Sequence, residues 1–180
     1  MSKKRLVILS DLWGKSNAKW IESYVEKLTL KFEVVFYDSC ELAGIEIETK
    51  PQNQEELHKQ FVEGGIEKAV NKLSELEKNT NSILLAFSIG GTIAWKYALK
   101  TTSTVTQLYC ISSTRLRYEV VKPQCSVYLY YGTNDLLTPD KKWFELLHTT
   151  AIFKEGNHEL YREQEFEKFI CEEIYKIEKV

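Results

Sequence analysis

The chain has 180 residues, of which 43 % are hydrophobic, 28 % charged and 12 % aromatic. We expect one domain, residues 1–180, because this length suits a single buried core and the apolar content is too high for a disordered chain. The 24 basic and 26 acidic side chains give a formal net charge of −2, so the chain lacks the basic excess that a nucleic-acid partner requires.

Apolar runs and amphipathic segments alternate along the whole chain. The apolar runs are rich in Val, Ile, Leu, Tyr and Phe, as is typical of strands covered on both faces, and span residues 5–10, 32–38, 82–87, 105–112, 126–131 and 149–154. Helical spacing of apolar residues predicts helices at residues 15–29, 54–78, 90–100, 140–148 and 160–179. Gly64 and Gly65 predict a kink or break in the second helix, and residues 39–53 predict a loop.

This strict alternation predicts a parallel sheet between two layers of helices, a three-layer α/β sandwich. Ligands of such sheets bind at the carboxyl ends of the strands, where the strand order reverses. The candidate functional residues are therefore those that directly follow the strands, at positions 10–14, 38–40, 88–91, 112–117, 132–135 and 155–158.

Targeting segments, membrane spans and cysteine patterns indicate where a protein resides. The apolar run at residues 6–9 is too short for a signal-peptide core, and no segment approaches the ~18–20 apolar residues of a membrane span. Cys40, Cys110, Cys125 and Cys171 are far apart and form no metal-binding pattern, so we expect buried free thiols. We therefore expect a cytoplasmic location, no membrane partner and no metal.

The third strand ends in A-F-S-I-G-G, residues 86–91, and passes directly into a helix. This resembles the nucleophile elbow of the α/β-hydrolases, in which a serine occupies a strand-to-helix turn with the pattern G-x-S-x-G. Strand and helix nearly touch there, so small residues are needed on both sides, and Ala86 and Gly90 supply them. Ala86 departs from the usual glycine by one methyl group. On this motif alone, Ser88 could instead simply cap the helix.

Two later loops resemble the acid and histidine loops of the same family. G-T-N-D follows the fifth strand and puts Asp135 at the position of the acid, although turn chemistry alone also explains an aspartate there. G-N-H follows the sixth strand and puts His158 at the position of the histidine. The other histidines, His58 and His148, lie on a polar helix and at a helix end, where we expect solvated roles. Serine, aspartate and histidine then follow in the chain order of this superfamily.

The resemblance extends over nearly the whole chain and implies a minimal α/β-hydrolase fold, with a mostly parallel six-stranded sheet of order 2-1-3-4-5-6. It also implies a serine hydrolase acting on small esters or thioesters, without a cofactor. Ser88 would be the nucleophile, His158 the general base and Asp135 the residue that orients the histidine. The backbone N–H groups of Ile89 and Leu12 would form the oxyanion hole.

The loop after the first strand departs from the family. Ser10 and Asp11 stand where His-Gly is usual. A carboxylate there opposes the oxyanion charge unless it points away or accepts a backbone hydrogen bond, and we expect Asp11 to do so by capping the helix near Lys15. The departure favours an alternative hypothesis, that the chain is a catalytically inactive small-molecule binding protein with the hydrolase scaffold.

Residues 113–124 are too few to form a lid, so we expect an open site and no activation at a lipid surface. The open site favours a small-molecule acyl substrate or an acyl group presented on a larger partner. Arg115, with Arg117 nearby, is a candidate to bind a substrate carboxylate, and Trp13 a candidate wall of the cleft. A solvated arginine and a half-buried core tryptophan are the alternatives. A nucleotide-binding function is excluded, because neither G-x-G-x-x-G nor G-x-x-x-x-G-K-[ST] follows any strand.

Overall fold

The computed structural model describes residues 3–46, 53–101 and 104–177. Their six strands form one parallel sheet in the order β2-β1-β3-β4-β5-β6, as predicted. The strands are β1 (Lys4–Leu9), β2 (Phe32–Tyr37), β3 (Ser82–Phe87), β4 (Val105–Ile111), β5 (Ser126–Gly132) and β6 (Ala151–Lys154). The order reverses between β1 and β3, so a crevice is expected at their carboxyl ends.

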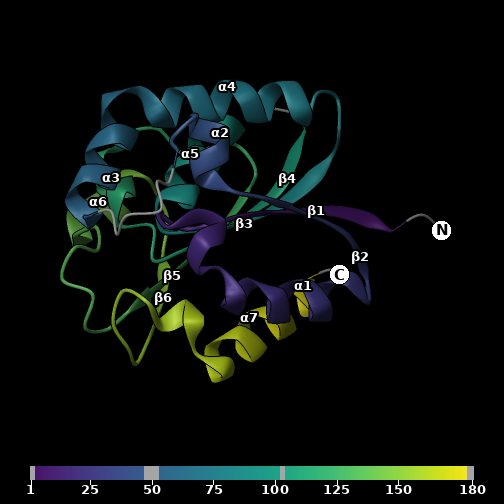
Figure 1. Cartoon of the computed structure of the whole chain (residues 1–180). Helices are drawn as coiled ribbons and strands as arrows, with labels where there is room; N and C mark the ends of the chain where they lie inside the picture. The colour runs from purple at the N-terminus through teal and green to yellow at the C-terminus, as the bar shows by residue number, and fades with distance from the viewer. Residues whose placement is uncertain (1–2, 47–52, 102–103, 178–180) are drawn as a thin grey trace.

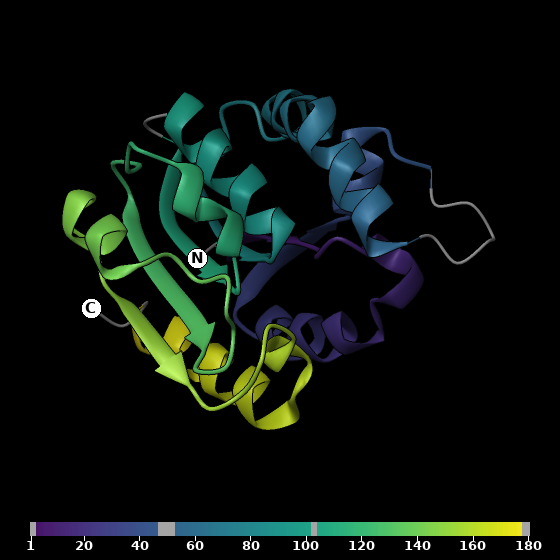
Figure 2. The same cartoon turned by 90° about the vertical axis from the view of Figure 1, so that its left-hand side faces the viewer.

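Helices cover both faces of the sheet (Figures 1 and 2). On one face lie α1 (Lys19–Thr29) and α7 (Gln164–Ile177), and on the other α2 (Ser39–Ala43), α4 (Ile66–Leu76), α5 (Ile89–Lys100) and α6 (Lys141–Leu146). Leu6 and Ile8 of β1 pack with the first layer, and Val7 and Leu9 with the second. All four side chains are fully buried, which explains why the strand is continuously apolar. No helix of the described residues is long and apolar enough to cross a bilayer.

The predicted loop at residues 39–53 is wrong at its start, where Ser39–Ala43 forms α2. The Asp38 carboxylate accepts hydrogen bonds from the backbone N–H groups of Cys40 and Glu41 and so caps this helix. Gly44 ends it with a φ of 65°, in the left-handed region that glycine enters without strain. A capping aspartate and a terminal glycine were thus present in the sequence as helix signals. Residues 47–52 of the same prediction lie outside the described residues.

The predicted break at Gly64 and Gly65 is confirmed. Residues Phe61–Gly65 separate α3 (Gln54–Gln60) from α4, and Gly64 has a φ of 134°, which favours glycine. The break allows α4 to pack on the sheet face while α3 extends toward the carboxyl ends of the strands (Figure 1).

Three of the predicted helices begin or end differently in the structure. The segments predicted as helices from residues 15 and 160 each open with a 3₁₀ turn, Gly14–Asn17 and Leu160–Arg162, and α1 and α7 begin only after these turns. The helix predicted at residues 140–148 is shorter, because Asp140 is its N-cap and the helix ends at Leu146.

Candidate active site

Ser88 lies in a strained turn between β3 and α5. Its φ of 50° and ψ of −117° fall outside the regions that residues with a side chain normally occupy. Its N–H donates to the Ile111 carbonyl at 2.8 Å, which extends the hydrogen bonding of the sheet into the turn. The Ser88 side chain makes no capping hydrogen bond to α5, so the structure does not support the helix-cap explanation of this residue.

Glycines at the start of α5 allow the helix to approach two neighbouring strands. A Cβ on Gly90 would lie 2.3 Å from the Ser10 carbonyl oxygen, and one on Gly91 would lie 1.7 Å from the Ser113 Oγ. Both distances are below van der Waals contact, so no side chain fits at either position. On the strand side, the methyl group of Ala86 is fully buried, so the turn accepts alanine in place of glycine. This packing brings the Ser88 turn next to the loop after β1.

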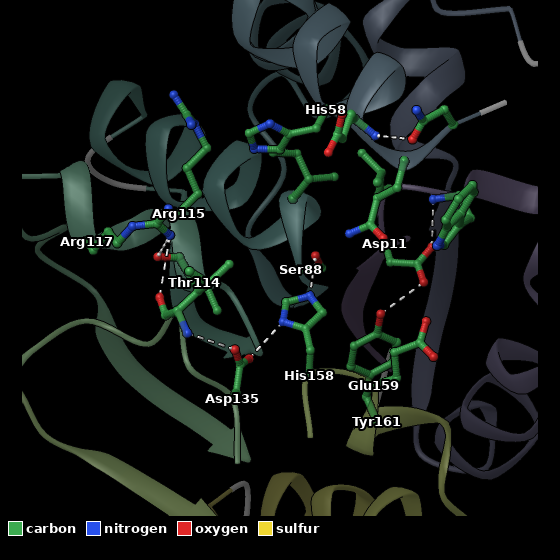
Figure 3. A pocket seen from close by; sticks show the side chains of 17 residues that line it. Asp11, His58, Ser88, Thr114, Arg115, Arg117, Asp135, His158, Glu159 and Tyr161 are labelled. Atoms are coloured by element: carbon green, nitrogen blue, oxygen red, sulfur yellow. Dashed lines mark hydrogen bonds and ion pairs between the residues drawn. The ribbon is translucent and has the colours of Figure 1, made fainter. Parts of the chain in front are cut away.

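Ser88, His158 and Asp135 form one chain of hydrogen bonds, although they come from three different strand ends (Figure 3). The Ser88 Oγ lies 2.9 Å from His158 Nε2, and His158 Nδ1 lies 2.7 Å from Asp135 Oδ2. The other oxygen of Asp135 accepts the Leu137 N–H at 3.3 Å. The Asp135 side chain is 3 % exposed and the His158 side chain 34 %, so the chain of contacts runs from the interior to an accessible imidazole.

The loops that carry Asp135 and His158 are held together through their backbones. The Asn134 N–H donates to the Gly156 carbonyl at 2.9 Å. A Cβ on Gly132 would lie 2.4 Å from the Asn157 carbonyl oxygen, so the two loops pack closely only because residue 132 is glycine. The short contact between acid and histidine is therefore supported by the loops themselves.

Two backbone N–H groups are available beside Ser88. Ile89 is the first residue of α5, where the helix leaves N–H groups unpaired, and Leu12 lies in the loop after β1. Within the described parts of the chain, neither N–H donates to a protein acceptor. Both residues line the same cavity as Ser88 and His158, and their role as an oxyanion hole stays a prediction.

Asp11 also lines the cavity, and both of its carboxylate oxygens accept hydrogen bonds. Its Oδ1 accepts the Trp13 N–H at 3.0 Å, and its Oδ2 accepts the Tyr161 hydroxyl at 3.1 Å and Arg162 Nη2 at 2.9 Å. The side chain is 1 % exposed. Burial raises the pKa of Asp11, while the hydrogen bonds and the charge of Arg162 oppose that rise. The Asp11 charge is therefore compensated from the α7 side.

The predicted role of Asp11 as a helix cap near Lys15 is wrong. The Lys15 N–H donates instead to Asp38 Oδ2 at 2.6 Å. Asp38 reaches it because residue 14 is glycine: a Cβ on Gly14 would lie 2.4 Å from the Asp38 carboxylate. The expectation that Asp11 accepts a backbone hydrogen bond holds, with Trp13 as the donor.

A cavity of about 650 Å³ opens over Ser88, of a size typical for small-molecule sites. Trp13 and Arg115, the two predicted substrate contacts, both line it. Sequence reasoning missed the contribution of α3, whose His58 also lines the cavity. Burial and the positive charges of Arg115 and Arg117 lower the pKa of His58. The kink before α4 was visible in the sequence, but the direction in which α3 leaves it was not.

The described residues include no group of three or more histidine, cysteine, aspartate or glutamate side chains that could hold a metal ion. The four cysteines are free, and three of them are buried, whereas Cys125 is partly exposed.

No protein-family model matches this sequence, and no curated protein matches it. Solved structures do match. Alpha/beta hydrolase domain-containing protein 10 from mouse is 14 % identical, with a TM-score of 0.69 over 99 % of this chain and 92 % of that one. An alpha-beta serine hydrolase homologue from Coxiella burnetii is 16 % identical, with a TM-score of 0.62 over 96 % of this chain and 86 % of that one.

A thermophilic esterase from Thermogutta terrifontis is 12 % identical, with a TM-score of 0.63 over 98 % of this chain and 91 % of that one. At such identities the likeness concerns the fold, and it covers most of the length of each matched structure. Together with the strand order and the turn at Ser88, these matches show that the chain has the α/β-hydrolase fold.

Proposed function

We propose that this protein is a serine hydrolase that cleaves small carboxylic esters or thioesters through an acyl-enzyme on Ser88. The observation that carries the proposal is the hydrogen-bonded series from Asp135 through His158 to Ser88, with contacts of 2.7 and 2.9 Å. The series ends on a serine in a strained backbone conformation at the base of a cavity. Such strain is characteristic of functional sites.

In the first step, His158 Nε2 takes the hydroxyl proton of Ser88 while Oγ forms a bond to the carbonyl carbon of the substrate. Asp135 accepts a hydrogen bond from Nδ1–H, which leaves Nε2 free to accept the proton, and its charge stabilises the imidazolium that results. The oxygen of the former carbonyl becomes negative and lies toward the N–H groups of Ile89 and Leu12.

The tetrahedral intermediate then collapses. The bond to the alkoxide or thiolate leaving group breaks, and the imidazolium of His158 gives that group its proton. Water enters, passes a proton to His158 and attacks the acyl carbon. The bond to Ser88 Oγ then breaks, His158 returns the proton to Oγ, and a carboxylic acid leaves. The ion pair between Asp11 and Arg162 supports this scheme, because it compensates the negative charge of the only carboxylate in the loop after β1.

The connection between β4 and β5 supports a small, soluble substrate. Its only regular structure is the 3₁₀ turn Thr114–Tyr118, which is far too short to form a lid domain. The likeness to a structure described as an esterase favours the ester class among carboxylic acid derivatives.

An activity-based fluorophosphonate probe tests the proposal. We expect the probe to label the protein at Ser88, and we expect Ser88→Ala to abolish labelling and to lower kcat for p-nitrophenyl butyrate by about 10⁴-fold or more. Ser74→Ala is the matched control, because the Ser74 hydroxyl bonds within α4 and does not line the cavity. A folded protein whose Ser88 stays unlabelled would favour the inactive binding protein instead.

A further inference from the structure

Two arginines form part of the cavity wall without an acidic partner. Arg115 and Arg117 lie in the 3₁₀ turn Thr114–Tyr118, and both line the cavity that contains Ser88 (Figure 3). Their guanidinium carbons lie 5.0 and 4.4 Å from the centre of the same Tyr118 ring. No carboxylate of the described residues forms an ion pair with either one. Both positive charges therefore lack a compensating carboxylate, and an anion bound between them and Ser88 would supply one.

The two arginines differ in what holds them. Arg117 donates to the Thr114 carbonyl at 2.9 Å, to the Leu137 carbonyl at 3.4 Å and to the Tyr118 hydroxyl at 3.0 Å. It therefore connects this turn to the loop that follows Asp135. The Arg115 guanidinium donates to no acceptor in the part of the chain that the structure describes, so its planar set of N–H donors is available to a ligand.

Most carboxylates that line the cavity are already paired. Asp11 and Glu159 bind Arg162, and Asp135 binds His158. Glu55, at the exposed first turn of α3, is the remaining one. The electrostatic environment of the neighbouring His58 is consistent with this. Burial and the positive charges of Arg115 and Arg117 lower the pKa of its imidazole. This part of the cavity is therefore electropositive in a protein whose net charge is negative.

The position of Ser88 indicates which part of a substrate reaches the arginines. Figure 3 shows Ser88 between His158 on one side and His58 with Arg115 on the other. In the proposed mechanism His158 protonates the leaving group, so the leaving group lies on the side of His158 and the acyl part extends toward Arg115. We propose that the acyl part of the substrate ends in a carboxylate bound by Arg115, which makes the substrate a monoester or monothioester of a dicarboxylic acid. This inference rests on the proposed serine hydrolase function.

Matched esters test the charge directly. The p-nitrophenyl monoester of adipic acid and the corresponding ester of adipamic acid differ only in a terminal carboxylate or neutral amide, and suberic and suberamic esters extend the chain. We expect kcat/KM to favour the carboxylate of one pair by about 10- to 100-fold at low ionic strength. The preference should shrink as salt screens the charges.

Arg115→Gln should reduce that preference to about one, and Arg115→Lys should retain part of it, since a lysine keeps the charge and loses the planar donor geometry. Lys141→Gln is the matched control: it removes the same charge from a side chain that is 90 % exposed and lies outside the cavity, and it should leave the preference intact.

Two outcomes separate this inference from the proposed function. If the wild type hydrolyses both esters of each pair equally well through Ser88, and Arg115→Gln affects both equally, the carboxylate site is overturned and the hydrolase stands. If no ester is hydrolysed, the hydrolase proposal fails, and calorimetry of adipate and suberate binding to Ser88→Ala tests the carboxylate site separately. Binding that depends on Arg115 supports the site. Absence of binding overturns the site as well.

Discussion

At the scale of single residues, the candidate site depends on a few side chains held by specific hydrogen bonds. Asp135 is an example. One of its oxygens accepts a hydrogen bond from the His158 imidazole, and the other accepts one from a backbone N–H of its own loop. It is buried, so its contact with the histidine is shielded from water and from salt.

Asp135→Asn should therefore lower kcat by about 10⁴-fold, because an amide favours the tautomer of His158 whose Nε2 carries the proton and cannot accept that of Ser88. Steady-state hydrolysis of p-nitrophenyl butyrate measures the effect. Asp140→Asn is the matched control: Asp140 caps α6 through the Trp143 N–H, asparagine caps almost equally well, and kcat should not change. Equal losses in the two variants would show that Asp135 is not the residue that orients the histidine.

Asp11 is the second informative residue. Asp11→Asn removes the charge that compensates Arg162, and breaking a buried ion pair costs about 3–5 kcal/mol when the remaining charge is left without a partner. We expect a smaller loss in the free energy of unfolding, because Arg162 also contacts Glu159 at 3.1 Å. Asparagine can still accept the Trp13 N–H, whereas Asp11→Ala removes this acceptor from the loop after β1, so we expect kcat to fall in the alanine variant.

Urea unfolding of Asp11→Asn measures the effect of the charge, and ester kinetics of Asp11→Ala measure the effect of the lost backbone contact. Full kcat in Asp11→Ala would contradict the role of Asp11 in holding the loop.

At the scale of elements, the site depends on the close approach of α5 to β1 and β4. Gly90 and Gly91 face the Ser10 carbonyl and the Ser113 side chain, so α5 can begin directly beside both strand ends. The strained serine, the free N–H of Ile89 and the contact with the β1 loop all follow from this packing. The conformation of the turn at Ser88 is therefore a property of three neighbouring elements.

Gly90→Ala should move the start of α5 away from β1, because the new Cβ would lie 2.3 Å from a backbone oxygen that cannot rotate away. We expect a loss of about 3 kcal/mol in stability, typical of overpacking, together with a large loss of kcat. Gly44→Ala is the comparison: at the end of α2 it meets no atom within 4 Å, and only its φ of 65° opposes the change. That variant should lose about 1–2 kcal/mol and keep its activity.

Chemical denaturation and kcat of both glycine variants check the prediction. It fails if Gly90→Ala retains the activity of Gly44→Ala.

At the scale of the whole molecule, packing between the sheet and the two layers of helices buries three of the four thiols. Burial raises the pKa of Cys40 and of Cys171 to about 12 and that of Cys125 to about 11. In the unfolded chain a thiol titrates near ~8.5. The folded state therefore holds these protons more tightly, and the resulting stability is complete below pH ~8.5 and is lost as the pH rises toward 11–12.

We expect the free energy of unfolding to fall between pH 8 and pH 10.5, as measured by urea denaturation. At pH 8 a thiol reagent should modify Cys125 slowly and the three buried cysteines only after unfolding. An unchanged free energy over that range, or rapid modification of all four thiols in the native protein, would contradict the burial of these groups.

The sequence by itself determined the six strands, most of the helices and the positions of the candidate site residues. Buried strands are recognisable as continuous apolar runs, and Ser88, Asp135 and His158 each directly follow one of them. The break at Gly64 and the small residues around Ser88 are also local signals, because backbone conformation and close approach restrict which residue types can occur. The cap of α2 was a local signal of the same kind, which the glycine and proline of the following segment obscured.

Only the tertiary structure decided where Asp11 points and what α3 covers. Asp11 lies 150 residues from Tyr161 and 151 from Arg162, and no local pattern connects residues so far apart. In the same way, His58 on a polar helix resembles any solvated histidine until the chain turns at Gly64 and brings it into the cavity wall beside Arg115. Periodicity and capping depend on neighbours in sequence, whereas the charge and shape of the cavity depend on long-range packing.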